Sequence, residues 1–167
     1  MNEAMLGFFE EERQNGFPFH HVHAVGKDGW ETMERALQQR GLDACADLDV
    51  RQYIYNMATV MRSADLVICR AGASTISELT ALGMPAIMVP SPYVTNNHQE
   101  KNARLLEAHG GAEVLLESEA SGEALYRAAA DILRSPDRQA QMKQGMAQLG
   151  IPDAAERIYK TVMALVR

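Results

Sequence analysis

The sequence is poor in the features of secreted, membrane-spanning and nucleic-acid-binding proteins. It has two cysteines in 167 residues, too few for a disulfide framework, so we expect Cys45 and Cys69 to be reduced thiols. No apolar run is long enough to span a bilayer, and the first residues lack the pattern of a signal peptide. Acidic residues outnumber basic ones by 22 to 16, which argues against a general nucleic-acid binder. These absences predict a cytoplasmic protein.

The residues that are present have the balance of a globular domain. Hydrophobic residues make up 47% and charged residues 23% of the chain, which suits one core, and we interpret residues 1–167 as a single domain. Short apolar runs alternate with helical periodicity, the pattern of an α/β fold with a mainly parallel sheet. The predicted strands are Phe19 to Val25, Asp49 to Ile54, Leu66 to Arg70, Pro85 to Pro90 and Ala112 to Leu116.

Helical periodicity fills most of the remaining chain. One buried stripe is predicted after Asn56, a plausible N-cap, and another in a last helix that spans residues 153–167. Their apolar residues are Met57, Val60, Met61 and Ala64, then Ala155, Ile158, Val162 and Leu165. The chain opens with a helical pattern and no preceding strand, whereas a doubly wound domain usually opens with a strand and a glycine-rich turn. We therefore expect the domain to be incomplete at its N-terminus.

The segment from Leu66 to Leu79 contains a predicted buried strand, a turn of small residues and the start of a helix. Free N–H groups and the positive dipole end of such a helix suit a phosphate, and the small residues allow close approach. A second interpretation needs no ligand, because Thr75 and Glu78 have the spacing of a capping box with Thr75 as the N-cap. The segment has neither GxGxxG nor a Walker lysine motif.

Three ordered motifs extend this observation. They are RAGASTISEL at 70–79, GMPAIMVP at 83–90 and NHQEKNA at 97–103. Together they resemble the C-terminal, donor-binding domain of the MurG family of bacterial glycosyltransferases, glycosyltransferase family 28. The resemblance implies a Rossmann-like doubly wound parallel sheet, the C-terminal half of a GT-B enzyme, with the first strand and its glycine loop missing here.

The resemblance also assigns roles to residues that would bind UDP-GlcNAc. It places Tyr53 and the Ile54 backbone on uracil, the helix start on the diphosphate and sugar, and a carboxylate on the ribose hydroxyls. A polar pair would face the GlcNAc ring. The helix start consists of Ala73, Ser74 and Thr75, and the carboxylate is that of Glu78. The polar pair at the sugar is His98 and Gln99.

No catalytic residue, metal ligand or cofactor is expected in this chain. His21 and His23 form an H-x-H pair beside His20, but no CxxC or HExxH partner supplies further ligands. The resembled reaction is an inverting, metal-independent transfer of GlcNAc from UDP-GlcNAc to undecaprenyl-diphospho-muramoyl-pentapeptide, lipid I, giving lipid II for peptidoglycan. Its catalytic base and acceptor loop belong to the family's N-terminal half, so we expect this chain to be inactive by itself.

Other functions stay open at this point. One alternative is that the chain is a non-catalytic UDP-sugar-binding subunit of a split N-acetylglucosaminyltransferase. A UDP-GlcNAc 2-epimerase is a weaker alternative, because no matching catalytic carboxylates are found. We expect UDP-GlcNAc as partner, the lipid-linked acceptor to bind through the N-terminal domain, no nucleic acid, and possible self-association through an exposed sheet edge. The resemblance also implies that the full-length protein is peripheral at the inner face of the cell membrane.

Overall fold

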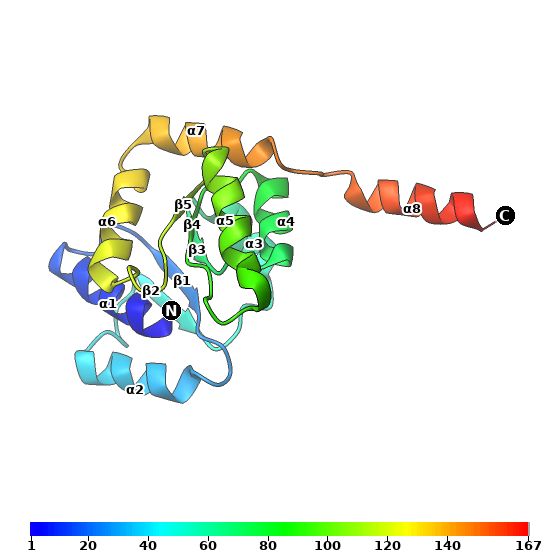
Figure 1. Ribbon diagram of the computed structural model, residues 1–167. Coiled ribbons are helices and arrows are strands. Elements are labelled where there is room, and N and C mark those ends of the chain that lie inside the picture. The colour runs from blue at the N-terminus through cyan, green and yellow to red at the C-terminus, as the bar shows by residue number, and fades with distance from the viewer. Residues whose placement is uncertain (167) are drawn as a thin grey trace.

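The structure is a computed structural model that describes residues 1–166, and its helices and strands alternate along most of the chain (Figure 1). The elements are α1 (Asn2–Gln14), β1 (His21–Ala24), α2 (Trp30–Arg40), β2 (Leu48–Arg51), α3 (Met57–Ser63), β3 (Val67–Cys69), α4 (Ala73–Leu82), β4 (Ala86–Met88), the 3-10 helix η1 (Thr95–Asn97), α5 (His98–Ala108), β5 (Ala112–Val114), α6 (Gly122–Leu133), α7 (Pro136–Ala147) and α8 (Ala154–Leu165).

All strand pairs in the described residues are parallel, which confirms the predicted fold class. The strands form two sheets, with the orders β1-β2 and β3-β4-β5, so the expectation of one sheet is wrong. Each predicted strand contains an observed one except the second, which begins one residue earlier and ends at Arg51 instead of Ile54. Val22 is opposite Asp49 in one sheet, and Ile68 is opposite Ile87 in the other. The free edges of β1 and β3 have no partner strand within residues 1–166.

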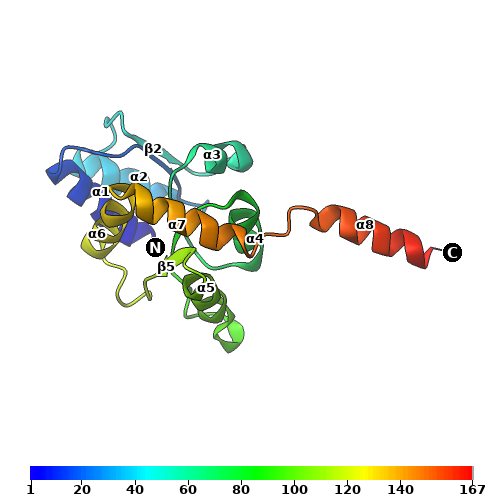
Figure 2. The ribbon, with the colours of Figure 1, turned by 90° about the horizontal axis from the view of Figure 1, so that it is seen from above.

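Helices cover both faces of the three-stranded sheet, as Figure 2 shows from above. Ile68 and Ile87 point to one face and join a core cluster formed with α1, α2 and α6. Cys69 and Met88 point to the other face and pack among residues of α3, α4, α5 and α7. Successive strand residues point to opposite faces, so continuous apolar strands suit a sheet covered on both sides.

Two glycines bring α1 and α6 into backbone contact. A Cβ at Gly122 would lie 2.3 Å from the carbonyl carbon of Gly7, a distance that real Cβ atoms do not reach. The close approach buries Phe8 and Phe9 completely or nearly so, with exposed fractions of 1% and 0%. A side chain at residue 122 would therefore force the two helices apart.

One ionisable group lies inside this core. The carboxylate of Glu12 on α1 is fully buried and has no hydrogen-bond partner within the described residues. Burial raises its pKa to about 7. His21 and His23 on β1 are also largely buried, and burial lowers the pKa of each to about 4. The H-x-H pair therefore packs against α1, with Phe9 in aromatic contact with both rings.

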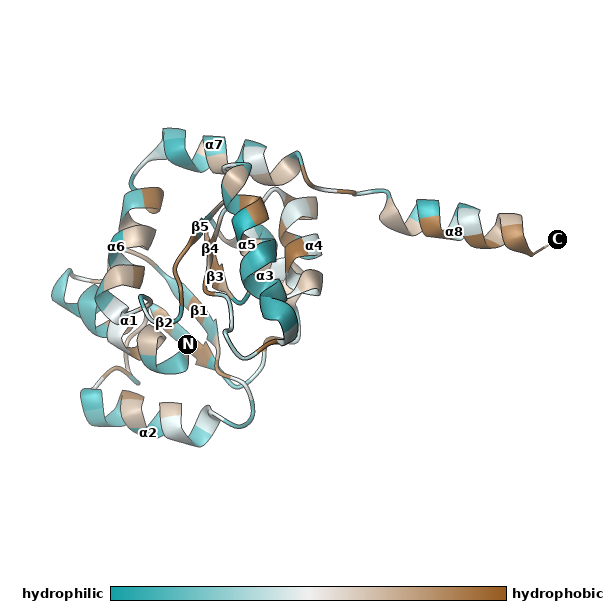
Figure 3. Cartoon of the chain, in the orientation of Figure 1, coloured by the Kyte–Doolittle hydropathy of each residue, from teal (hydrophilic) through white to brown (hydrophobic). Residues whose placement is uncertain are grey.

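The last helix lies apart from the body of the molecule. α8 begins after Asp153 as predicted, but none of its residues is buried, and it projects from the end of α7 (Figure 1). Figure 3 shows its apolar residues on the outside of the fold. The expectation of a buried stripe is therefore wrong here, since Ile158 is 65% and Val162 50% exposed. The stripe of α3 is also less buried than predicted, because only Met61 is buried.

Candidate functional site

The turn between β3 and α4 presents free backbone donors at the carboxyl end of the sheet. The first backbone hydrogen bond of α4 runs from the Ile76 N–H to the Gly72 carbonyl, at 3.0 Å. The N–H groups of Ala73, Ser74 and Thr75 precede it, and no side chain within residues 1–166 caps this helix end. Three backbone donors at the positive end of a helix dipole are therefore free to bind an anion.

The capping box predicted here is wrong. Gly72, with φ −71° and ψ 146°, is the N-cap, and Thr75 lies inside the first turn rather than before it. Gly72 has no steric reason to be glycine, because a Cβ there would come no closer than 3.9 Å, to the hydroxyl of Thr75. The space in front of the helix end is therefore open.

Glu78 lies on the exposed side of α4, about one turn beyond the free N–H groups. Its carboxylate makes no hydrogen bond and no ion pair with the described residues. A carboxylate with no protein partner is available to accept hydrogen bonds from vicinal hydroxyls of a ligand.

Tyr53 and Ile54 lie in the loop after β2, rather than in the strand itself. The Tyr53 side chain is 63% exposed, and its ring meets that of Tyr55 edge-to-face at 4.9 Å between centroids. Ile54 is buried, with 5% exposed, yet its backbone makes no hydrogen bond with the rest of residues 1–166. The loop thus offers an aromatic face beside free peptide groups. No hydrogen bond or ion pair joins these two residues to α4 or α5 in the described part of the chain.

His98 and Gln99 open α5, directly after a strained turn. Asn96 and Asn97 both have positive φ, 56° and 50°, a conformation that asparagine tolerates better than most residues. The Nδ1 atom of His98 lies 2.9 Å from the Thr95 carbonyl oxygen. A carbonyl only accepts, so in the neutral ring Nδ1 carries the hydrogen and Nε2 is free as an acceptor.

Gln99 is fixed by the loop that follows β4. Its carboxamide oxygen accepts a hydrogen bond from the Ser91 backbone N–H at 2.9 Å. A backbone N–H requires an acceptor, which assigns oxygen rather than nitrogen to this contact. The NH₂ group is left to donate to another partner. Since β3 and β4 are parallel neighbours, this loop and the α4 turn lie at the same edge of the sheet.

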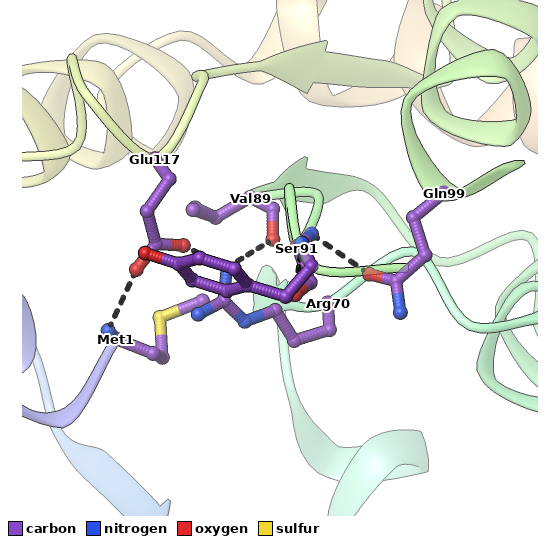
Figure 4. A network of polar contacts seen from close by, with 7 residues as sticks. Met1, Arg70, Val89, Ser91, Gln99 and Glu117 are labelled. Carbon is purple, nitrogen blue, oxygen red and sulfur yellow. Dashed lines mark hydrogen bonds and ion pairs between the residues drawn. The ribbon is translucent and has the colours of Figure 1, made fainter. Parts of the chain in front are cut away.

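Sequence reasoning missed an ion pair at this edge. Arg70, directly after β3, donates to the carboxylate of Glu117 and to the Val89 carbonyl, the latter at 3.1 Å (Figure 4). The hydrogen bond from Arg70 holds the pKa of Glu117 below its usual value. The amino group of Met1 also lies 3.4 Å from Glu117. Arg70 stands inside the recognised motif, but its partner is 47 residues away, beyond the reach of local pattern.

The remaining candidate groups form no second site. No three His, Cys, Asp or Glu residues in the part of the chain described are placed to hold a metal ion. Cys45 and Cys69 are free, and burial raises the pKa of the Cys69 thiol to about 12, which opposes thiolate formation. No helix within residues 1–166 is both long and apolar enough to cross a bilayer.

The comparison with protein families matches residues 1–158 to the model described as "Glycosyltransferase family 28 C-terminal domain". The chain belongs to this family. The expected family is therefore confirmed, and the free donors of α4 lie within the matched range. Residues 159–165, the rest of the exposed helix α8, lie outside the match.

The curated relatives are longer proteins. The chain is 39% identical over all of its 167 residues to a Bacillus cereus protein named UDP-N-acetylglucosamine--N-acetylmuramyl-(pentapeptide) pyrophosphoryl-undecaprenol N-acetylglucosamine transferase 1, and covers 45% of it. It is 40% identical over 149 residues to the Acetivibrio thermocellus protein named as the transferase, which gives 89% coverage of the chain and 40% of the relative. The chain spans less than half the length of these relatives.

Solved structures agree with the fold. The crystal structure of Acinetobacter baumannii MurG matches 98% of the chain and 45% of that protein, with a TM-score of 0.77 and 27% identity. The calicheamicin glycosyltransferase CalG4 and a Listeria monocytogenes protein titled as a UDP-N-acetylglucosamine 2-epimerase match with TM-scores of 0.66 and 0.72, at 17% and 14% identity. At such identities the likeness concerns the fold alone. The GT-B half predicted from the sequence is thereby confirmed.

Proposed function

We propose that this domain binds UDP-GlcNAc as the donor-binding part of an inverting N-acetylglucosaminyltransferase that acts on a lipid-linked muramoyl-pentapeptide. The observation that carries the proposal is the open α4 end, where three backbone N–H groups and the Glu78 carboxylate have no partner among the described residues. The names of the relatives, at 39% and 40% identity, support the choice of sugar and acceptor.

Each group of site residues binds a different part of UDP-GlcNAc. The N–H groups of Ala73, Ser74 and Thr75 bind the diphosphate, and Glu78 accepts hydrogen bonds from the ribose hydroxyls. The exposed ring of Tyr53 covers the uracil face, and the free Ile54 peptide groups bind its edge. His98 and Gln99 face the sugar, where the Gln99 NH₂ donates to a ring substituent.

In the reaction, an acceptor hydroxyl attacks the anomeric carbon of the sugar while the bond to the UDP oxygen breaks. Negative charge grows on the leaving diphosphate. The α4 N–H groups are already oriented toward that charge, so they stabilise the transition state without rearrangement. The part of the chain described supplies no group that we assign to proton removal from the acceptor.

The relatives' names support a lipid-linked acceptor as a partner. We propose that the lipid-linked acceptor binds elsewhere in the full-length protein, and that this protein is peripheral at the cytoplasmic face of the membrane. The unpaired edges of β1 and β3 offer a route to self-association, because an unpaired strand can pair with another chain.

Calorimetric titration of this chain with UDP-GlcNAc, UDP and GDP-mannose tests the proposed function. We expect UDP-GlcNAc to bind most tightly and GDP-mannose not at all, because the base and sugar contacts are specific to uracil and GlcNAc. Addition of EDTA should leave the affinity unchanged, since no metal ligands are assigned. Equal binding of the two nucleotide sugars, or no binding of UDP-GlcNAc, contradicts the proposal.

A further inference from the structure

The ion pair between Arg70 and Glu117 joins the ends of all three strands of its sheet. Arg70 follows β3 directly, its guanidinium donates to the Val89 carbonyl one residue beyond β4, and Glu117 lies three residues beyond β5. Both side chains are about one-third exposed, at 33% and 31%. The guanidinium has several donors in a fixed plane, so it can hold both partners at once.

The ion pair is connected to Gln99 through the backbone from Val89 to Ser91, which Figure 4 shows from close by. Val89 is anchored from both sides, because its N–H donates to the Cys69 carbonyl at 2.9 Å and its own carbonyl accepts from Arg70. Pro90 follows and fixes one backbone dihedral. Ser91 is next, and its N–H holds the Gln99 carboxamide oxygen.

We propose that Arg70 and Glu117 are positioning residues that orient the Gln99 carboxamide for the donor sugar. This inference rests on the proposed function only in naming the sugar as the group that Gln99 meets. Without Glu117, the Arg70 guanidinium loses the carboxylate that holds it beside the Val89 carbonyl, and the loop from Pro90 to Ser91 is then free to shift. The Ser91 N–H then no longer fixes which end of the Gln99 amide faces the ligand.

A second ion pair provides a matched control. Arg138 on α7 pairs with Glu113 on β5 at 2.6 Å, and the Glu113 side chain is 28% exposed, close to the 31% of Glu117. This control pair shares no hydrogen-bond partner with Arg70 or Gln99. Glu113→Ala therefore removes a similar contact from the same sheet without touching the Gln99 path.

The first test compares the sugar-dependent gain in affinity, the ratio of the Kd for UDP to that for UDP-GlcNAc. We expect Glu117→Ala to reduce this ratio about three- to tenfold with little change in the Kd for UDP, the size expected for one lost hydrogen bond. Gln99→Met should reduce it similarly, and the double variant no further. Glu113→Ala should leave it unchanged. Equal weakening of UDP and UDP-GlcNAc by Glu117→Ala, or additive effects in the double variant, overturns the inference.

The second test needs no ligand. NMR signals of the Gln99 side-chain NH₂ and the Ser91 N–H should shift or broaden in Glu117→Ala and remain in place in Glu113→Ala. Unchanged signals in Glu117→Ala overturn the inference. If the unmodified chain binds no UDP-GlcNAc while these signals shift as expected, the proposed function fails and the positioning contact stands.

Discussion

The Oε1 atom of Glu12 lies 3.4 Å from the Nε2 atom of His21 inside the core, and neither atom has a hydrogen-bond partner in the described residues. Burial raises the pKa of the carboxyl to about 7 and lowers that of the imidazole to about 4. Both groups are therefore held toward their uncharged forms. Their effects on stability have opposite dependence on pH.

The first prediction concerns this buried carboxyl. The pKa of Glu12 rises from 4.5 in the unfolded chain to about 7, so the folded state binds the extra proton between these values. Its contribution to the free energy of unfolding is thus lost as pH rises through 7. The difference in free energy of unfolding between Glu12→Gln and the unmodified chain should therefore depend on pH. It should favour the variant by about 1 to 3 kcal/mol more at pH 8 than at pH 5.

Thermal unfolding of the Glu12→Gln variant and the unmodified chain at both pH values measures this difference. Glu3→Gln, which changes an exposed carboxylate on the same helix, is the control. His23, with its lowered pKa, adds stability as pH rises from about 4 to 6.5 in both proteins. His21 contacts Glu12, so the same comparison in a His21→Gln background removes its titration from the difference. A pH-independent difference would show that Glu12 is charged in the fold.

The second prediction is that Glu78→Gln weakens UDP-GlcNAc binding about 10- to 100-fold, the loss expected for hydrogen bonds to a charged acceptor. The melting temperature should not change, because the carboxylate has no protein contact in the described residues. Titration calorimetry and thermal unfolding measure the two quantities. A lower melting temperature with unchanged affinity would restore the capping role.

Gly72→Ala separates folding from binding at the turn itself. The backbone there, at φ −71° and ψ 146°, suits alanine, and the nearest atom to a new Cβ lies 3.9 Å away. Stability should be equal or higher by about 0.4 to 1 kcal/mol. Affinity for UDP should fall, because the methyl group occupies the approach to the α4 N–H groups. Unchanged affinity would place the diphosphate elsewhere.

Tyr53→Ala tests the base contact. Loss of ring stacking should weaken binding of both UDP and UDP-GlcNAc by about 1 to 3 kcal/mol, the range for an aromatic side chain on a base. Tyr159→Ala is the matched control, since the two rings are 63% and 64% exposed. Equal affinities of the two variants would assign the uracil to another surface.

The last prediction concerns α8. Removal of residues 153–167 should leave the melting temperature of the rest of the chain within about 1 °C, because no residue of this helix is buried. Scanning calorimetry of the full and shortened chains measures it. A large fall in the melting temperature would mean that α8 packs on the body in solution.

Local sequence determined the order of helices and strands and pointed to the turn before α4 as the candidate site. Apolar β-branched runs specify the strands, and the residues from Ala71 to Ala73 place no large side chain at the α4 end. The capping box was wrong for a local reason. The N-cap is Gly72 instead of the predicted Thr75, so Thr75 and Glu78 already lie within the helix.

Tertiary structure decided the rest. Arg70 meets Glu117 only because parallel pairing brings the ends of β3 and β5 to one edge, across 47 residues of sequence. The same packing selects which end of the Gln99 amide is free. The apolar stripe of α8 shows the same limit, because periodicity specifies that a face is apolar but not whether another element covers it. Contacts between distant residues depend on the whole fold, so a short segment of sequence does not specify them.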